Sequence, residues 1–141
     1  MDIRPAALQD ADALTELTAQ LGYAADVGAI RQRITTIAAR DDHLLVVAVL
    51  DNKIAGWLQA QASITLESGF RVEILGLVAA AGWRRRGVGR GLVEHAEQWA
   101  RAQGAPALVA RSNTLRTESH HFYPALGFAA AKTQAVYRKK L

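Results

Sequence analysis

The chain has 141 residues, of which 50% are hydrophobic, and its 17 basic and 13 acidic residues give a formal net charge of +4. This length and composition predict one globular domain over residues 1–141. The absence of cysteine excludes disulfides, cysteine-rich metal sites and a thiol nucleophile. The N-terminus lacks the apolar core of a signal peptide, and the longest aliphatic run, Leu44 to Leu50, is far too short to span a bilayer. We therefore expect a cytoplasmic protein that does not associate with membranes.

Hydrophobic periodicity predicts short elements in the order β-α-α-β-β-β-α-β-α-β. The first is a strand at residues 3–5, and we expect Asp10 to cap the helix that follows and Gly22 to end it. Next come a helix at 27–37 and strands at 43–50, 53–66 and 70–79, with a turn at Asp51-Asn52 between the first two strands.

The second half of the chain continues this alternation. An apolar stripe that begins at Val88 predicts a helix ending near Gly104. Three elements follow: a strand at 106–111, a helix at 114–123 and a closing pair of strands that ends near residue 137. Because Pro124 disfavours helical conformation in the residue before it, the last helix is expected to end at Tyr123. The order predicts a mixed α/β fold, with a mostly antiparallel sheet and helices on both faces.

The most informative segment is Arg84 to Leu92, which holds three glycines and four arginines between a predicted strand and a predicted helix. Glycine lets the backbone approach a ligand closely, and a helix start offers unpaired N–H groups and the positive end of a dipole. This arginine–glycine segment therefore predicts an anion site, for which a phosphate or pyrophosphate is the best candidate.

Two well-known phosphate-binding patterns do not fit the arginine–glycine segment. Gly82 and Gly87 have the spacing of a P-loop, but the lysine that must follow is replaced by Val88. Gly87 and Gly89 could start a dinucleotide fingerprint, but Leu92 stands where its third glycine belongs. Both readings fail.

A third pattern, Gln/Arg-x-x-Gly-x-Gly/Ala, is present at Arg84, Gly87 and Gly89. It resembles the signature of the GNAT family of N-acetyltransferases, which holds the pyrophosphate of acetyl-CoA. Further matches are the preceding strand at 73–79, Ser112-Asn113 after the next strand, the N-terminal Ile3-Arg4-Pro5-Ala6 with Asp10, and Phe122-Tyr123-Pro124-Ala125-Leu126-Gly127-Phe128, which is similar to the family's Phe-Tyr-x-x-Leu-Gly-Phe motif.

The resemblance implies a GNAT fold, in which a central, mostly antiparallel mixed sheet splays open between two parallel strands, here 70–79 and 106–111. Acetyl-CoA lies in this opening as a cosubstrate, and no metal is implied. The residues expected to contact it are Leu77, Val78, Ala79, Arg84, Arg85, Arg86, Gly87, Val88, Gly89, Arg90, Asn113, Ser119, Phe122 and Tyr123. The backbone of Leu77 and Ala79 pairs with the pantetheine arm, and about half of the arginines are expected to point into water.

Two residues are candidates for catalysis by the same resemblance. Glu73, expected on the same strand face as Leu75 and Leu77, is the candidate general base, because an amine with a pKa of ~10.4 must lose a proton before it attacks. The alternative is a surface glutamate paired with Arg71 or another arginine. Tyr123 is the candidate general acid for the CoA thiolate, and its alternative is a packing role.

Polar residues near the C-terminus allow more than one role. Asn113 contacts the pantetheine or caps the following helix. Ser119 faces CoA in the family, but also suits an exposed helix surface. His120 and His121 are read as structural or cofactor-adjacent rather than catalytic.

The leading hypothesis is thus an acetyl-CoA-dependent N-acetyltransferase, with direct attack by a primary amine in a ternary complex. A non-catalytic acyl-CoA-binding or sensor module is the first alternative. A basic nucleic-acid binder is the second, but the basic residues are not interleaved with aromatic residues, and we expect no nucleic-acid partner. The sequence does not identify the acceptor amine, and a homodimer is expected only from the resemblance.

Overall fold

The computed structural model describes residues 1–83 and 86–141. By their contacts these residues form two compact units, Met1–Arg111 and Ser112–Leu141. Arg84 and Arg85, which were expected to contact the cofactor, lie outside the described residues.

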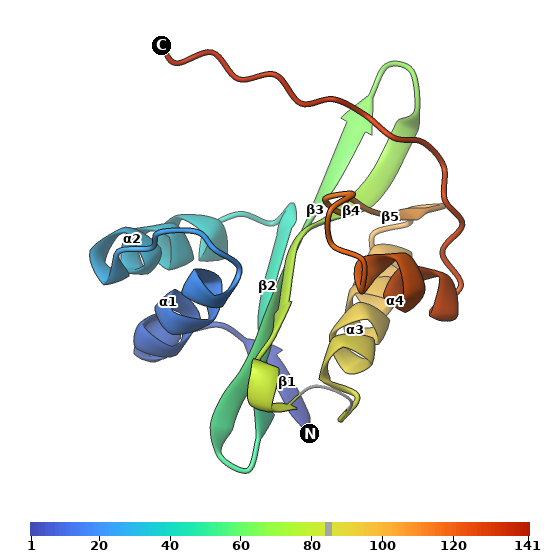
Figure 1. The fold of residues 1–141 in the computed structure, drawn as a ribbon. Helices are drawn as coiled ribbons and strands as arrows, with labels where there is room; N and C mark the ends of the chain where they lie inside the picture. The colour runs from blue at the N-terminus through green and yellow to red at the C-terminus, as the bar shows by residue number, and fades with distance from the viewer. Residues whose placement is uncertain (84–85) are drawn as a thin grey trace. The chain divides into compact units, whose positions relative to one another are not determined.

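The first unit contains one five-stranded sheet in the order β1-β2-β3-β4-β5 (Figure 1). Its strands are β1 (Asp2–Pro5), β2 (His43–Leu50), β3 (Lys53–Thr65), β4 (Gly69–Ala79) and β5 (Leu108–Ala110). Neighbours from β1 to β4 are antiparallel, whereas β4 and β5 are parallel. The predicted mixed, mostly antiparallel sheet is confirmed, and β2 has the predicted bounds.

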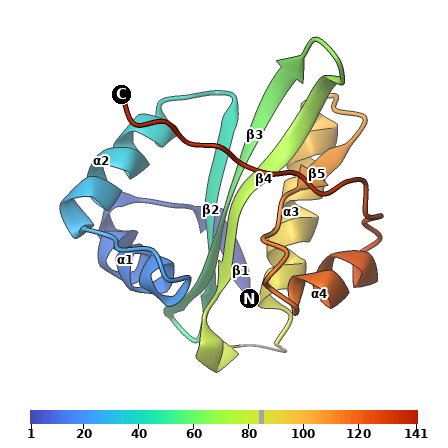
Figure 2. The same cartoon turned by 45° about the horizontal axis from the view of Figure 1, so that its top comes forward.

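Helices cover both faces of this sheet, as predicted. α1 (Ala11–Gln20) and α2 (Val27–Ala38) lie together on one face, and α3 (Val88–Ala102) lies on the other (Figure 2). Single 3₁₀ turns, η1 (Leu8–Asp10) and η2 (Ala81–Trp83), precede α1 and follow β4.

Each face has a buried apolar layer. On the α1/α2 face, Leu14 and Ile34 pack with Val47 of β2. On the α3 face the backbone of Gly56 comes so close to the helix that a Cβ there would lie 3.2 Å from Leu92. Burial of these side chains supplies most of the stabilisation of the sheet.

The predicted cap at Asp10 is wrong in its detail. Its carboxylate accepts two hydrogen bonds of 2.8 Å from the Arg4 guanidinium and one of 2.8 Å from the backbone N–H of Ala7, and it does not cap α1. These donors lower the pKa of Asp10 below its ordinary value, the Arg4 hydrogen bond being the largest cause. The carboxylate therefore links β1 to η1 by hydrogen bonds. This role depends on the position of Arg4 in the folded chain, which the local sequence pattern does not give.

The second unit contains α4 (Ser119–Ala125) and a C-terminal segment without secondary structure. The helix starts later than predicted because residues 113–119 form turns, and it continues through Pro124, so the predicted end at Tyr123 is wrong. The predicted closing strands are wrong too, because residues 129–141 are exposed and pair with no strand in the described part of the chain. Three consecutive alanines, which have low strand propensity, weaken this segment as a strand.

Candidate functional site

A bulge at Leu75 reorganises the middle of β4. The register pairs Ile74 with Ala60 and Gly76 with Gln59, which leaves Leu75 without a partner and 45% exposed. A bulge moves the following residues to the opposite face of the sheet. The expectation that Glu73 shares a face with Leu77 is therefore wrong.

After this shift, Glu73 lies on the α1/α2 face of the sheet with Gly76 and Val78. Val78 is buried there against Leu17 of α1. The ring of Trp57 covers Gly76 so closely that a Cβ at Gly76 would lie 2.7 Å from a ring carbon. Glycine at position 76 is thus required by the tryptophan, and Glu73, which precedes the bulge, lies on the same face.

The two parallel strands separate at the bulge. β4 pairs with β5 only through residues 72–74 and 108–110. Within the first unit, residues 75–79 of β4 have no strand beside them on that side, so their backbone groups are available to a ligand. This is the expected splayed opening, and it contains the predicted cofactor residues Leu77, Val78 and Ala79.

The start of α3 has the geometry of an anion site. Gly87 precedes the helix with φ at +79°, the left-handed region that favours glycine. The first backbone donor bonded inside the helix is Gly91, to the carbonyl of Gly87 at 2.9 Å. The N–H groups of Val88, Gly89 and Arg90 precede it, so they are free of helical partners and carry the positive end of the dipole.

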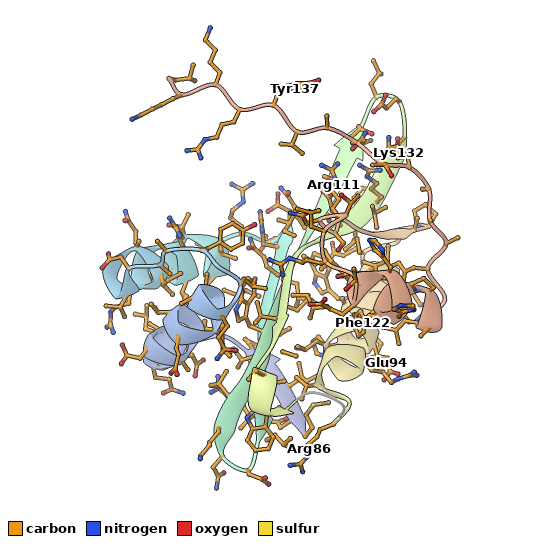
Figure 3. All side chains as sticks on the ribbon, in the orientation of Figure 1. Arg86, Glu94, Arg111, Phe122, Lys132 and Tyr137 are labelled. Carbon is orange, nitrogen blue, oxygen red and sulfur yellow. The ribbon has the colours of Figure 1, made fainter. Side chains whose placement is uncertain are left out.

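The arginines beside this site differ in environment. The guanidinium of Arg86 lies 5.1 Å from the ring centroid of Trp83, a cation–π contact. Arg90 is an exposed residue in the first turn of α3. Figure 3 shows Arg86 at the end of the first unit where η2 meets α3, toward the opposite end of the sheet from Arg111. Val88 is 2% exposed, so only its backbone is free to serve the site.

Glu73 is held by an arginine from the neighbouring strand end. Arg111, which follows β5, places Nε 2.5 Å from Glu73 Oε1, although this contact lacks the direction of a hydrogen bond. The Glu73 side chain is 14% exposed and the Arg111 side chain is 62% exposed. The alternative to a catalytic Glu73 was a glutamate paired with Arg71 or another arginine, and the structure pairs it with Arg111. The role of Glu73 as a base stays a prediction.

Polar side chains surround Glu73 on the same face. Gln61 lies opposite Glu73 in the register, and His43 lies opposite Gln61. The amide of Gln59 lies 3.2 Å from His43 Nδ1. Sequence reasoning missed this row because it took the strands singly. The signal was the polar residues at alternate positions 59 and 61 of an otherwise apolar strand.

The second unit contains the remaining predicted residues. The Tyr123 ring packs edge-on against Phe122 and Phe128, with centroids 5.1 Å and 5.4 Å away. Burial raises the pKa of the Tyr123 phenol above its ordinary value, and the positive charge of Arg116 opposes this shift. The phenol is therefore protonated at neutral pH, as a proton donor must be.

Asn113 and Ser119 take local positions in this unit. The Asn113 side-chain oxygen accepts a 3.0 Å hydrogen bond from the N–H of Leu115. It thus caps the turn before α4 rather than the helix itself. Ser119 is the first residue of α4 and is partly buried, whereas His120 and His121 are exposed.

The described residues contain neither a cluster of metal-binding side chains nor a helix that could span a membrane. No group of three or more His, Cys, Asp or Glu side chains among them is arranged to hold a metal ion. In the same residues, no helix is both long and apolar enough to cross a membrane.

Comparison with known proteins assigns this arrangement to a family. Residues 11–128 match the Acetyltransferase (GNAT) family. The chain belongs to the GNAT acetyltransferase family. The match extends from the start of α1 to Phe128, and so includes both the arginine–glycine segment and the Phe122–Phe128 motif. The family predicted from these motifs is confirmed.

Individual GNAT relatives support the same fold. An uncharacterized N-acetyltransferase from Bacillus subtilis (strain 168), YhdJ, is 26% identical over 110 residues, which cover 78% of this chain and 75% of the relative. The aminoglycoside 6'-N-acetyltransferase AAC(6')-IG from Acinetobacter haemolyticus superposes with a TM-score of 0.86 at 22% identity, over 100% of this chain and 99% of that chain. AAC(6')-Iy, solved in complex with CoA, gives a TM-score of 0.83 at 22% identity, over 99% and 100%.

Proposed function

We propose that this GNAT chain transfers the acetyl group of acetyl-CoA to a primary amine by direct attack in a ternary complex. Two features together carry the proposal. They are the opening of β4 beyond residue 74 and the left-handed Gly87 before the first N–H groups of α3, which have no helical partners. The first suits an extended polar arm, and the second suits a pyrophosphate.

The donor is proposed to bind mainly through the backbone. The pantetheine arm adds to β4 along Leu77 and Ala79 like a further strand, and the pyrophosphate accepts hydrogen bonds from the first N–H groups of α3. The CoA complex of AAC(6')-Iy supports this choice of donor. Arg86 already contacts Trp83, whereas Arg90 is exposed. Of these two arginines, Arg90 is therefore the better candidate for a direct phosphate contact.

The chemistry starts from an ammonium group, so the nitrogen loses two protons in all and the thiolate gains one. Glu73 takes a proton from the ammonium group, the amine nitrogen attacks the thioester carbonyl, and a tetrahedral intermediate forms. A backbone N–H near Val78 or Ala79 stabilises its oxyanion. The carbon–sulfur bond then breaks, and Tyr123 protonates the departing thiolate. The second proton of the former ammonium nitrogen is lost to solvent, and the Tyr123 phenolate regains a proton from solvent. The raised pKa of Tyr123 supports the last role, because the phenol retains its proton until it is needed.

A binding or sensor module on the same fold is the competing proposal, and a sensor needs neither Glu73 nor Tyr123. The deciding experiment measures CoA binding by calorimetry and then thiol release from acetyl-CoA with a panel of primary amines. Binding together with amine-dependent thiol release supports the transferase. CoA binding without release on any amine favours the sensor, and an absence of CoA binding refutes both.

The C-terminal segment supports a further proposal, that the protein forms a homodimer. Val136 and Tyr137 are 89% and 93% exposed in a segment without secondary structure. Contact with a second copy would bury these side chains. Light scattering after size-exclusion chromatography tests it: a mass of about 15 kDa in dilute solution would leave the monomer as the working unit.

A further inference from the structure

The face of the sheet around Glu73 carries more positive than negative charge. Arg71 lies two residues before Glu73 in β4, on the same face, and opposite Ser63 of β3. Arg111 is paired with Glu73. Within the described residues Arg71 has no carboxylate at ion-pair distance. One carboxylate and two guanidinium groups therefore leave a surplus of one positive charge.

Arg71 also contains a buried donor without an acceptor. Its Nε is fully shielded from solvent and has no hydrogen-bond partner among the described residues. A buried donor that makes no hydrogen bond lowers stability, so such groups in native proteins call for an explanation. An acceptor oxygen on a ligand supplies one, and a carboxylate matches the fork of donors on a guanidinium.

The positions of the two charges define the ligand further. Residues two apart on a strand are separated by about 7 Å, and here one is negative and its neighbour is positive. An ammonium group fits beside the Glu73 carboxylate, and an anionic group fits beside Arg71. We propose that the acceptor is an amine that also carries a carboxylate, such as an amino acid, whose carboxylate is bound by Arg71. This inference rests on the proposed acetyltransferase function and names its substrate class.

A polycationic acceptor fits this face less well. It would bring further positive charge toward Arg71 and Arg111. The acidic residues that the sequence offers to such a ligand are partly engaged elsewhere. Asp42 is paired with Arg40 at 3.0 Å, and Asp26 accepts a hydrogen bond from the N–H of Ala29, which caps α2. This chain is thus expected to differ in acceptor from its aminoglycoside-acetylating neighbours.

The test compares amino acids with their carboxamides in the thiol-release assay. Each pair presents the same amine and differs in the negative charge. We expect kcat/KM to be at least about tenfold higher for the acids, the effect of one charge-assisted hydrogen-bonded pair. The Arg71→Gln variant is expected to lower the acid-to-amide ratio to about one. Arg33→Gln, on the exposed surface of α2, is the matched control and should retain the wild-type ratio.

The possible outcomes distinguish a failure of the proposed acceptor class from a failure of the proposed acetyltransferase function. If amides, polyamines or aminoglycosides react as well as the acids, the transferase stands and the carboxylate preference is refuted. An unchanged ratio in Arg71→Gln also refutes the role of Arg71. If CoA binds but no amine is acetylated, the proposed function fails, and the substrate class fails with it. The wild-type acid and amide comparison does not depend on any variant folding.

Discussion

Replacing Gly87 by alanine tests the anion site through its backbone. Gly87 has φ at +79°, a conformation that costs an alanine about 1–2 kcal/mol. Apart from its two chain neighbours, no group among the described residues lies within 4 Å of the added Cβ, so we assign no steric cost to it. We therefore expect the free energy of unfolding to fall by about 1–2 kcal/mol.

The same substitution should also weaken CoA binding. If the chain relaxes at residue 87, the first N–H groups of α3 turn away from the pyrophosphate. Each charge-assisted hydrogen bond lost costs about 1.5–3 kcal/mol, so the dissociation constant should rise roughly 10- to 150-fold. Urea unfolding measures the first effect and calorimetric titration with CoA the second.

Gly82 provides the control for this experiment. It lies nearby in η2, has open space around its Cβ position, and does not adopt a positive φ. Gly82→Ala should thus change the stability by less than about 1 kcal/mol and leave CoA affinity unaltered. If Gly87→Ala bound CoA as the wild type does, or if both variants lost affinity equally, the assignment of the pyrophosphate to this helix start would be wrong.

Three further substitutions test the remaining roles. Glu73→Gln should lower kcat/KM about 100-fold or more. Glu97→Gln, which breaks a pair with the exposed Arg101 on α3, should leave kcat/KM intact, and similar losses in the two variants would reject Glu73 as the base. Tyr123→Phe should lower kcat by about 100-fold. Because burial raises the pKa of Tyr123, the rate of the wild-type enzyme should decline only above pH 10. If the variant were fully active, Tyr123 would have only a packing role. Asp10→Asn should destabilise the fold by about 2–4 kcal/mol at pH 7. Because the folded-state pKa of Asp10 is lowered, the extra stability of the wild type should be present above about pH 4 and vanish as the pH falls through that pKa. Urea titrations at several pH values measure it, and a stability difference that did not change with pH would contradict this explanation.

Local sequence patterns predicted the regular parts of the fold well. The bounds of β2 follow from an apolar run ended by the turn at Asp51-Asn52. Both turn residues have positive φ, at 52° and 62°, which asparagine and aspartate tolerate better than other residues. The helix start at Val88 was predictable for a similar reason, because Gly87 marks the change of conformation before it.

The features that were missed depend on contacts between distant residues. Asp10 is a good N-cap residue in isolation, but Arg4 and the N–H of Ala7 occupy its oxygens. The bulge at Leu75 depends on how β4 pairs with β3, and its one local signal is the isolated glycine at position 76 beside it. Without the bulge, alternation alone would place Glu73 on the face opposite to the one it occupies.

That bulge gives β4 two separate roles in the proposed reaction. Beyond Leu75 the strand presents an open edge, where backbone groups can pair with the donor. Before Leu75 its α1/α2 face presents Glu73 and Arg71, where side chains can select the acceptor. Donor recognition through the backbone tolerates changes of side chain, whereas acceptor recognition depends on them. A fold that divides the two tasks in this way can therefore retain one cosubstrate while the acceptor amine changes.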